Sequence, residues 1–179
     1  MVLQAVIFSV ALLATVPALA QPVRDQNARL IARSSFDRSR LLGDWYEVAQ
    51  TPTFLERDCH GTTVNIEERE DSRLTMQISC HVGAIDGPIL PIDGIMVESA
   101  PGIFLVRLIR LPHLGNLPLI VIWESEDASL LALGTPRGEI GWIWARSAHP
   151  DFAGFDKARQ ALVAQGYRAS AIQAVQHAP

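Results

Sequence analysis

The sequence predicts an all-β protein, an eight-stranded antiparallel up-and-down β-barrel with one C-terminal α-helix packed outside it. The first observation is a series of eight short apolar segments bounded by Gly, Pro or Asp clusters, the pattern of strands joined by tight turns. The second is that no repeat, low-complexity tract or linker divides this series. The third is a change to helical spacing after Arg146. Eight strands that close into a barrel leave no exposed strand edge.

The expected strands lie between Asp44 and Arg146. Their approximate bounds are 44–51, 61–69, 74–82, 92–99, 103–111, 119–124, 129–135 and 140–146. Turn-forming residues fall at 70–72, 101–102, 126–127 and 136–138. Residues 36–42 are expected to form a short helical turn that covers the end of the barrel at Trp45.

One amphipathic helix is expected after the eighth strand. Phe155, Ala158 and Leu162 recur at helical spacing between Pro150 and Gly166. This apolar stripe needs a surface to pack on, and the outer wall of the barrel offers one. Residues 167–175 then have the pattern of a last short strand.

Length and composition indicate a single exported domain. The 179 residues are 49% hydrophobic and 19% charged, and their net charge of −4 argues against a nucleic-acid partner. Residues 1–20 carry no charge and end in Ala18-Leu19-Ala20, which is typical of a cleavable signal peptide rather than a membrane anchor. No Cys lies at the cleavage point to carry a lipid. We therefore expect a signal peptide at 1–20, a loosely packed arm at 21–35, a barrel domain at 36–179, and a location in the periplasm or outside the cell.

Two cysteines, Cys59 and Cys80, each precede a histidine. In an exported chain the simplest interpretation is a disulfide, here between the second and third strands. A zinc site built from these cysteines with His60 and His81 is the alternative. Adjacent residues of a strand point to opposite faces and cannot converge on one ion, so we expect the disulfide and no metal.

The segment Gly141-Trp142-Ile143-Trp144-Ala145-Arg146 places Trp142, Trp144 and Arg146 on one face of a strand. A cation among aromatic side chains needs a partner, and the ring of Trp45 in the first strand can supply a cation–π surface. We expect Trp45 and Arg146 to form a structural latch at one end of the barrel.

Both segments resemble signature regions of the lipocalins. Leu42-Gly43-Asp44-Trp45-Tyr46-Glu47-Val48-Ala49-Gln50 is similar to the first region and Trp142-Ile143-Trp144-Ala145-Arg146 to the third, with bacterial lipocalins and apolipoprotein D the most similar in pattern. The resemblance covers residues 36–175. The middle region departs from the family pattern, because Glu124-Ser125-Glu126 stands where Thr-Asp-Tyr is usual. The resemblance implies a calyx that carries a small hydrophobic or amphiphilic ligand, most simply a lipid such as a fatty acid or lysophospholipid, without a cofactor.

Alternation along the strands suggests which side chains face the interior. The residues expected to bind the ligand are Val64, Met76, Ile78, Phe104, Val106, Trp123, Trp142 and Trp144, with Thr62, Ile66, Ile95 and Val121 as further inward candidates. The same residues could instead fill a solid core, and the resemblance to a ligand-carrying family favours a pocket. Glu47 lies in the first signature, and the sequence does not decide whether it faces the cavity or a structural partner.

Charged residues near one rim are candidates for contact with a ligand headgroup or a membrane surface. Arg107, Arg110 and His113 could meet a phosphate or carboxylate there, or could simply be solvated surface charges. The sequence has no Gly-x-Ser-x-Gly elbow, His-Glu-x-x-His pair or phosphate loop, so we expect a binding protein rather than an enzyme. Two alternatives remain open: a barrel enzyme acting on a lipid or isoprenoid, and an envelope interaction protein without a ligand.

Overall fold

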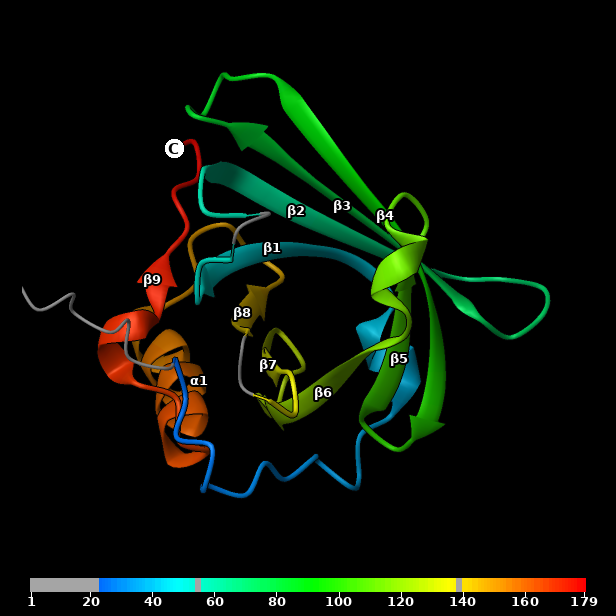
Figure 1. Ribbon diagram of the computed structural model, residues 1–179. Coiled ribbons are helices and arrows are strands. Elements are labelled where there is room, and N and C mark those ends of the chain that lie inside the picture. The colour runs from blue at the N-terminus through cyan, green and yellow to red at the C-terminus, as the bar shows by residue number, and fades with distance from the viewer. Residues whose placement is uncertain (1–22, 54–55, 138–139) are drawn as a thin grey trace, which may run out of the picture.

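The strands form a closed barrel (Figure 1). The computed structural model describes residues 23–53, 56–137 and 140–179, so the expected signal peptide lies outside the described residues. The eight barrel strands are β1 (Gly43–Gln50), β2 (Cys59–Glu68), β3 (Leu74–Val82), β4 (Ile89–Ala100), β5 (Ile103–Leu108), β6 (Leu117–Glu124), β7 (Leu130–Gly134) and β8 (Gly141–Ala145). Each pairs with the next in antiparallel fashion, and β1 pairs with both β2 and β8. The predicted up-and-down barrel is therefore confirmed.

β4 begins earlier than the sequence suggested, at Ile89 rather than Ile92. Pro91 lies within the strand although it has no backbone N–H to donate. The reason is the pairing pattern: β4 pairs with β3 from Ile89 onward, whereas its register with β5 begins only at Gly94. Pro91 is thus paired with β3 on one side, and on its other side it lies before the point where pairing with β5 begins.

Two side chains expected inside the barrel lie on the other face. The register between β6 and β7 shifts between Val121 and Trp123, so a bulge breaks the alternation there. Val121 stays in the interior cluster, but Trp123 packs in the outer cluster beneath the helix. In β4, Met96 rather than Ile95 is the buried interior residue. The prediction that Trp123 and Ile95 face inward is wrong.

The C-terminal helix α1 (Phe152–Ala164) lies outside the ring of strands, as predicted (Figure 1). Asp151 caps its first turn by accepting a hydrogen bond from the Gly154 amide. Ala158 and Leu162 are buried in the outer cluster together with Leu130 of β7. None of the helices in the described residues is long and apolar enough to cross a membrane.

The chain after α1 forms less strand than expected. Within residues 167–175 the one named strand is β9 (Gln173–Ala174), which pairs with β1, whereas Tyr167 forms an isolated bridge with Arg24 and packs in the outer cluster. Its hydroxyl donates to the Ile140 carbonyl at 2.8 Å. A Cβ at Gly134 would lie 2.3 Å from that hydroxyl, so only glycine allows the ring to lie this close to β7.

The described part of the N-terminal arm is packed more closely than the sequence suggested. Arg24 is buried, its Nε donates to the Gln165 carbonyl at 2.6 Å, and its guanidinium lies 5.8 Å from the centre of the Tyr167 ring. The Asp25 amide also donates to the Gly166 carbonyl at 2.9 Å. This arm is therefore joined to the segment that follows α1.

Candidate ligand cavity

A cavity of about 380 Å³ lies inside the barrel, within the range of pockets that hold small organic ligands. Its apolar wall is made of side chains from β3 to β6, namely Met76, Ile78, Ile92, Val106, Leu108, Leu117 and Leu119. Trp142 and Trp144 of β8 form the facing wall. The interior is hollow on this side, and a solid apolar cluster fills the rest.

The mouth of the cavity is at the end of the barrel where the odd-numbered strands finish. Its lining there comes from the β1–β2 connection (Thr53, Glu56), the β5–β6 connection (Leu114, Asn116) and the β7–β8 connection (Pro136, Arg137). In an up-and-down barrel these three connections share one end. The opposite end carries a 3₁₀ turn at Arg38–Leu41, and we call it the closed end.

The residues predicted to bind a ligand are distributed in three ways. Met76, Ile78, Val106, Trp142 and Trp144 line the cavity. Val64 and Phe104 are buried in the interior cluster but do not line it. Trp123 lies outside the barrel wall, as described above.

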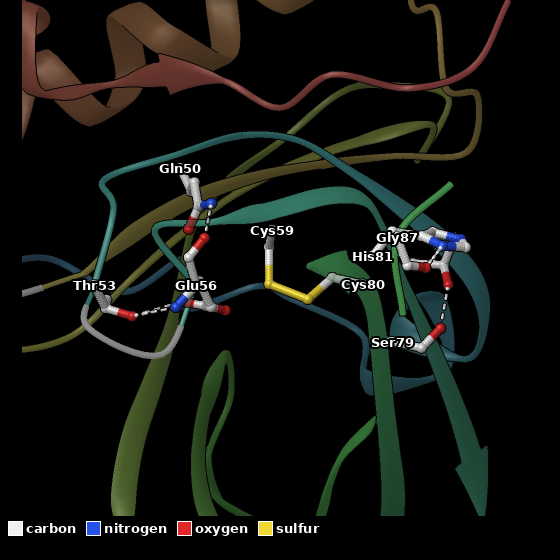
Figure 2. The surroundings of a disulfide bond; sticks show 9 residues. Gln50, Thr53, Glu56, Cys59, Ser79, Cys80, His81 and Gly87 are labelled. Atoms are coloured by element: carbon white, nitrogen blue, oxygen red, sulfur yellow. Dashed lines mark hydrogen bonds between the residues drawn. A yellow bond between two sulfur atoms is a disulfide. The ribbon is translucent and has the colours of Figure 1, made fainter. Parts of the chain in front are cut away.

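One side of the barrel interior carries buried polar side chains, although the rest of the interior is apolar. Glu47 and Gln50 of β1 stand directly opposite Trp144 and Trp142 of β8 in the antiparallel register, so each pair shares a face. Glu56 joins them from the β1–β2 connection. Figure 2 shows how it is held: Gln50 Nε2 donates to the Glu56 carbonyl at 3.1 Å, and the Thr53 hydroxyl meets the Glu56 carboxyl at 3.2 Å.

The carboxyls of Glu47 and Glu56 are both buried, and burial raises the pKa of each. Glu47 is fully buried, and burial raises its pKa well above 4.5, with the nearby Glu56 carboxyl raising it further. Burial also raises the pKa of Glu56, while hydrogen bonding from Thr53 and Trp142 opposes the rise. The Trp144 indole N–H, which lies near the Glu47 carboxyl without a well-aligned hydrogen bond, opposes the rise in the Glu47 pKa in the same way.

Sequence reasoning located only part of this polar wall. Alternation from Trp45 places Glu47 on the same inward face, a signal that could have resolved its orientation. Gln50 returns to that face because the β1–β8 register shifts between Glu47 and Ala49. Glu56 was missed because it lies in a connection, where periodicity carries no information.

The structure brings Trp45 and Arg146 together at the closed end. The guanidinium carbon of Arg146 lies 3.5 Å from the centre of the Trp45 ring. The same guanidinium donates to the carbonyls of Asp44, Arg40 and Leu42 at 2.7, 2.9 and 2.8 Å. The Trp45 indole donates to the Leu41 carbonyl at 2.8 Å. Arg146 thus joins β8 to the start of β1 and to the 3₁₀ turn that precedes it.

Gly43 leaves room for this arrangement. Its φ is +89°, a left-handed conformation that glycine adopts without strain, and an added Cβ would lie 3.3 Å from Arg146 Nη1.

The segment Glu124-Ser125-Glu126, which departs from the family pattern of the middle signature region, also lies at the closed end. Glu124 is buried at the end of β6 and accepts hydrogen bonds from Arg33 Nε at 3.1 Å and from Arg40 Nη1 at 3.0 Å. Its carboxylate therefore ties the β6–β7 turn to the N-terminal arm and to the 3₁₀ turn. The departure from the family pattern affects this end rather than the cavity mouth.

The predicted disulfide is present between Cys59 of β2 and Cys80 of β3 (Figure 2). Both sulfurs are consumed by it, and the described residues contain no group of three or more His, Cys, Asp or Glu side chains able to hold a metal ion. His81 instead hydrogen-bonds the Gly87 carbonyl through Nδ1 at 2.9 Å.

The three candidate rim residues, Arg107, Arg110 and His113, do not lie on one surface. Arg107 alternates with the inward Val106 and lines a groove on the outer wall with Arg73. Arg110 and His113 are exposed in the β5–β6 connection, close in sequence to Leu114 and Asn116 at the cavity mouth. Of the three candidates, Arg110 and His113 are therefore the ones near the mouth, where Arg137 is also exposed.

Comparison with solved structures finds the same fold in several proteins. Lobster apocrustacyanin A1 matches with a TM-score of 0.64 and 14% identity, covering 80% of this chain and 81% of that one. Insecticyanin from the tobacco hornworm Manduca sexta matches with a TM-score of 0.64 and 15% identity over 88% of each chain. The cockroach allergen Per a 4 matches with a TM-score of 0.63 and 15% identity, covering 86% of this chain and 97% of that one. At these identities the likeness concerns the fold alone.

Sequence comparison goes further than the shared fold. A protein of Acanthamoeba polyphaga mimivirus named "Putative lipocalin R877" is 30% identical over 145 residues, 77% of this chain and 83% of that protein. A family model described as a lipocalin-like domain matches residues 36–177, which include every barrel strand, the helix and the Trp45–Arg146 contact. The chain belongs to the lipocalin family.

Proposed function

We propose that this protein is an exported carrier or scavenger that binds a small hydrophobic molecule, such as a fatty acid or lysophospholipid, inside the barrel. The observation that carries the proposal is the cavity of about 380 Å³, whose lining is mainly apolar. A disulfide between β2 and β3 supports export, because such bonds persist in oxidising compartments. A relation to bacterial lipocalins and apolipoprotein D within the family is part of the same proposal.

The energetics favour a ligand with a long apolar body. Each methylene transferred from water to an apolar cavity contributes about 0.8 kcal/mol, so a long acyl chain gains roughly 10 kcal/mol before the costs of association and ordering. Met76 adds a polarisable, adaptable surface to the apolar wall. Binding of this kind needs a dry and suitably shaped interior, and reversible burial would keep an amphiphile out of water or membrane.

The test is a titration with twelve-carbon ligands followed by intrinsic fluorescence, because Trp142 and Trp144 line the cavity. Val106 and Leu105 are neighbours on β5, with Val106 lining the cavity and Leu105 on the outer groove. Val106→Phe should fill part of the cavity and weaken binding at least tenfold, whereas Leu105→Phe should leave it unchanged. Equal affinities in the two variants would contradict binding inside the barrel.

Recovery of the ligand after incubation separates carriage from catalysis. A carrier returns its ligand chemically unchanged, and mass spectrometry of the extracted ligand should show the starting compound alone. A product that accumulates with time would support a barrel enzyme instead. Failure of every apolar ligand to bind the wild-type protein would favour an interaction role without a ligand.

A further inference from the structure

One side of the cavity is lined by Glu56, Trp142 and Trp144, and the buried Glu47 and Gln50 lie next to these residues without lining the cavity themselves. Glu47 and Gln50 are fixed by the β1–β8 register opposite Trp144 and Trp142. Glu56 is only 5% exposed, and its backbone and side chain are both held, by Gln50 and Thr53 respectively. A carboxyl from a strand and a carboxyl from a connection therefore meet two indoles inside the barrel.

Several polar atoms of this cluster lack a partner among the described residues. Both carboxyl oxygens of Glu47 and the Oε1 of Gln50 are buried without a well-aligned hydrogen bond, and the Trp144 and Trp142 indole N–H groups lie near the Glu47 and Glu56 carboxyls respectively. Buried polar groups in proteins are nearly always paired, because an unpaired one destabilises the fold. The three unpaired oxygens are acceptors, so a ligand group that completes their hydrogen bonding must be a hydrogen-bond donor.

The charges in the cluster indicate the sign of that group. No ion pair joins Glu47 or Glu56 to a cationic side chain in the described part of the chain. Arg137, the cationic residue of the cavity lining, is exposed at the mouth. A ligand carboxylate placed here would add a third acidic group, whereas a cation would stabilise the ionised form of the pair.

The aromatic residues favour the same choice. The face of an indole attracts cations, and carboxylates combined with tryptophans are a chemistry suited to ammonium groups. The opposite wall, from Met76 to Leu119, is apolar and would hold the body of the same molecule.

We propose that Glu47, Glu56, Trp142 and Trp144 form a subsite for a protonated amine, so that the ligand is a hydrophobic molecule bearing an ammonium group. This inference rests on the proposed function, because it places the ammonium group of a ligand held in the same cavity. The ammonium lies at Glu56, the carboxyl that lines the cavity, and its charge also acts on the neighbouring Glu47 carboxyl. The apolar body extends along β3 to β6.

Proton movement follows from this arrangement. Burial raises the pKa of both carboxyls and a neighbouring ammonium lowers it, so binding of the amine is linked to proton release. Affinity for an amine should therefore rise with pH until the amine itself loses its proton. In the described part of the chain, two further charged or titratable groups lie near the pair: Arg137 at the mouth and His177, whose Nε2 contacts the Glu47 carbonyl at 2.8 Å.

The experiment compares dodecylamine, dodecanol and dodecanoic acid at pH 8, each below its micellar concentration, by isothermal titration calorimetry. The amine should bind at least tenfold more tightly than the alcohol, and the acid no more tightly than the alcohol. Glu47→Gln should lower the amine affinity at least tenfold and leave the alcohol within threefold. Glu56→Gln should act in the same direction, and titration in two buffers of different ionisation enthalpy should show proton release.

The controls separate this proposal from general binding. Glu126 is an exposed carboxylate in the β6–β7 turn, so Glu126→Gln should change neither the amine affinity nor the alcohol affinity. This variant controls for general attraction of the amine to an acidic protein surface. Retained alcohol binding shows that each variant is folded with an open cavity. If the amine binds no better than the alcohol, or if both Glu→Gln variants keep the wild-type preference, the ammonium subsite is wrong while the carrier function stands. If none of the three ligands binds, the carrier function itself fails and the subsite with it.

Discussion

At the closed end of the barrel, the Arg146 guanidinium donates hydrogen bonds to backbone carbonyls. Three carbonyls, at Arg40, Leu42 and Asp44, face the same guanidinium and accept its hydrogen bonds. Arginine suits this position because its planar group has donors in several directions while its face rests on an aromatic ring. The ring of Trp45 serves as that surface and plugs the end of the interior cluster.

Arg146→Ala should therefore lower the free energy of unfolding by about 2–4 kcal/mol, through loss of the charged hydrogen bonds and the ring contact. Urea denaturation monitored by circular dichroism would measure the change. Arg110→Ala is the matched control, because Arg110 is exposed and should fall within about 0.5 kcal/mol of wild type. A variant at Arg146 that unfolds like wild type yet fails to bind ligand would show that the residue serves the cavity and is no latch.

Glu47 should make stability depend on pH in a direction opposite to that of most carboxylates. Its folded-state pKa lies well above 4.5, so the folded chain holds a proton that the unfolded chain releases. The contribution of Glu47 to the free energy of unfolding is fully present below about pH 4.5 and is lost as pH rises through its folded-state pKa. The total loss is about 1.4 kcal/mol for each pKa unit by which the folded-state value exceeds the unfolded-state value. Glu47→Gln should remove the loss, so the variant should gain stability relative to wild type as pH rises from 5 to 8. Thermal melts across that range would test it, and a wild-type advantage growing with pH would contradict it.

At the scale of elements, the disulfide holds together the two strands that follow the β1–β2 connection. Cys59 and Cys80 are 21 positions apart, and a closed loop of that size restricts the unfolded chain by about 3 kcal/mol in the loop-entropy model. The bond also anchors the C-terminal end of the connection that contains Glu56 (Figure 2).

Replacing both cysteines by serine should lower the free energy of unfolding by roughly 3 kcal/mol. Wild-type protein treated with a reductant should unfold at the same urea concentration as the double variant. Intact-mass measurement before and after reduction confirms that the bond was present. Should the reduced and oxidised proteins share one midpoint, the bond would contribute nothing to stability.

Helix α1 depends on its packing against the barrel rather than on its own sequence. Leu162 is fully buried in the outer cluster, whereas Val163 beside it is 40% exposed. Leu162→Ala should lower the free energy of unfolding by about 2–4 kcal/mol, because it leaves a cavity between helix and sheet. Val163→Ala should change it by less than about 0.5 kcal/mol. Similar losses in both variants would mean that the helix is not packed through the Leu162 face.

At the scale of the whole molecule, a closed ring of strands separates two apolar clusters that share the same wall. The inner cluster and the cavity lie inside the ring, and the outer cluster lies between the wall and α1. This explains why strands such as β7 are buried on both faces and do not show a simple alternation. Alternation identified the inner face well in β3 and β5, but in β6 the bulge between Val121 and Trp123 broke it.

Much of the fold could be predicted from the sequence because it depends on local pattern. Turn residues marked the strands, helical spacing marked α1, and the need of the Arg146 cation for an aromatic partner indicated that the strands of Trp45 and Arg146 meet. The candidate site was predicted only in part. Met76, Ile78, Val106, Trp142 and Trp144 line the cavity as expected, whereas a bulge moves Trp123 to the outside. Whether these side chains contact a ligand remains a prediction.

The sequence by itself determined the barrel, its closing contact and its disulfide, because strand alternation, turn chemistry and pairs of distinctive residues are readable along the chain. Only the tertiary structure decided that the interior is hollow and that its hollow is polar on one side. The volume of a cavity depends on how side chains from all the walls meet. The approach of Glu56 to Glu47 depends on a connection that folds back into the barrel, and neither property is encoded in a local period.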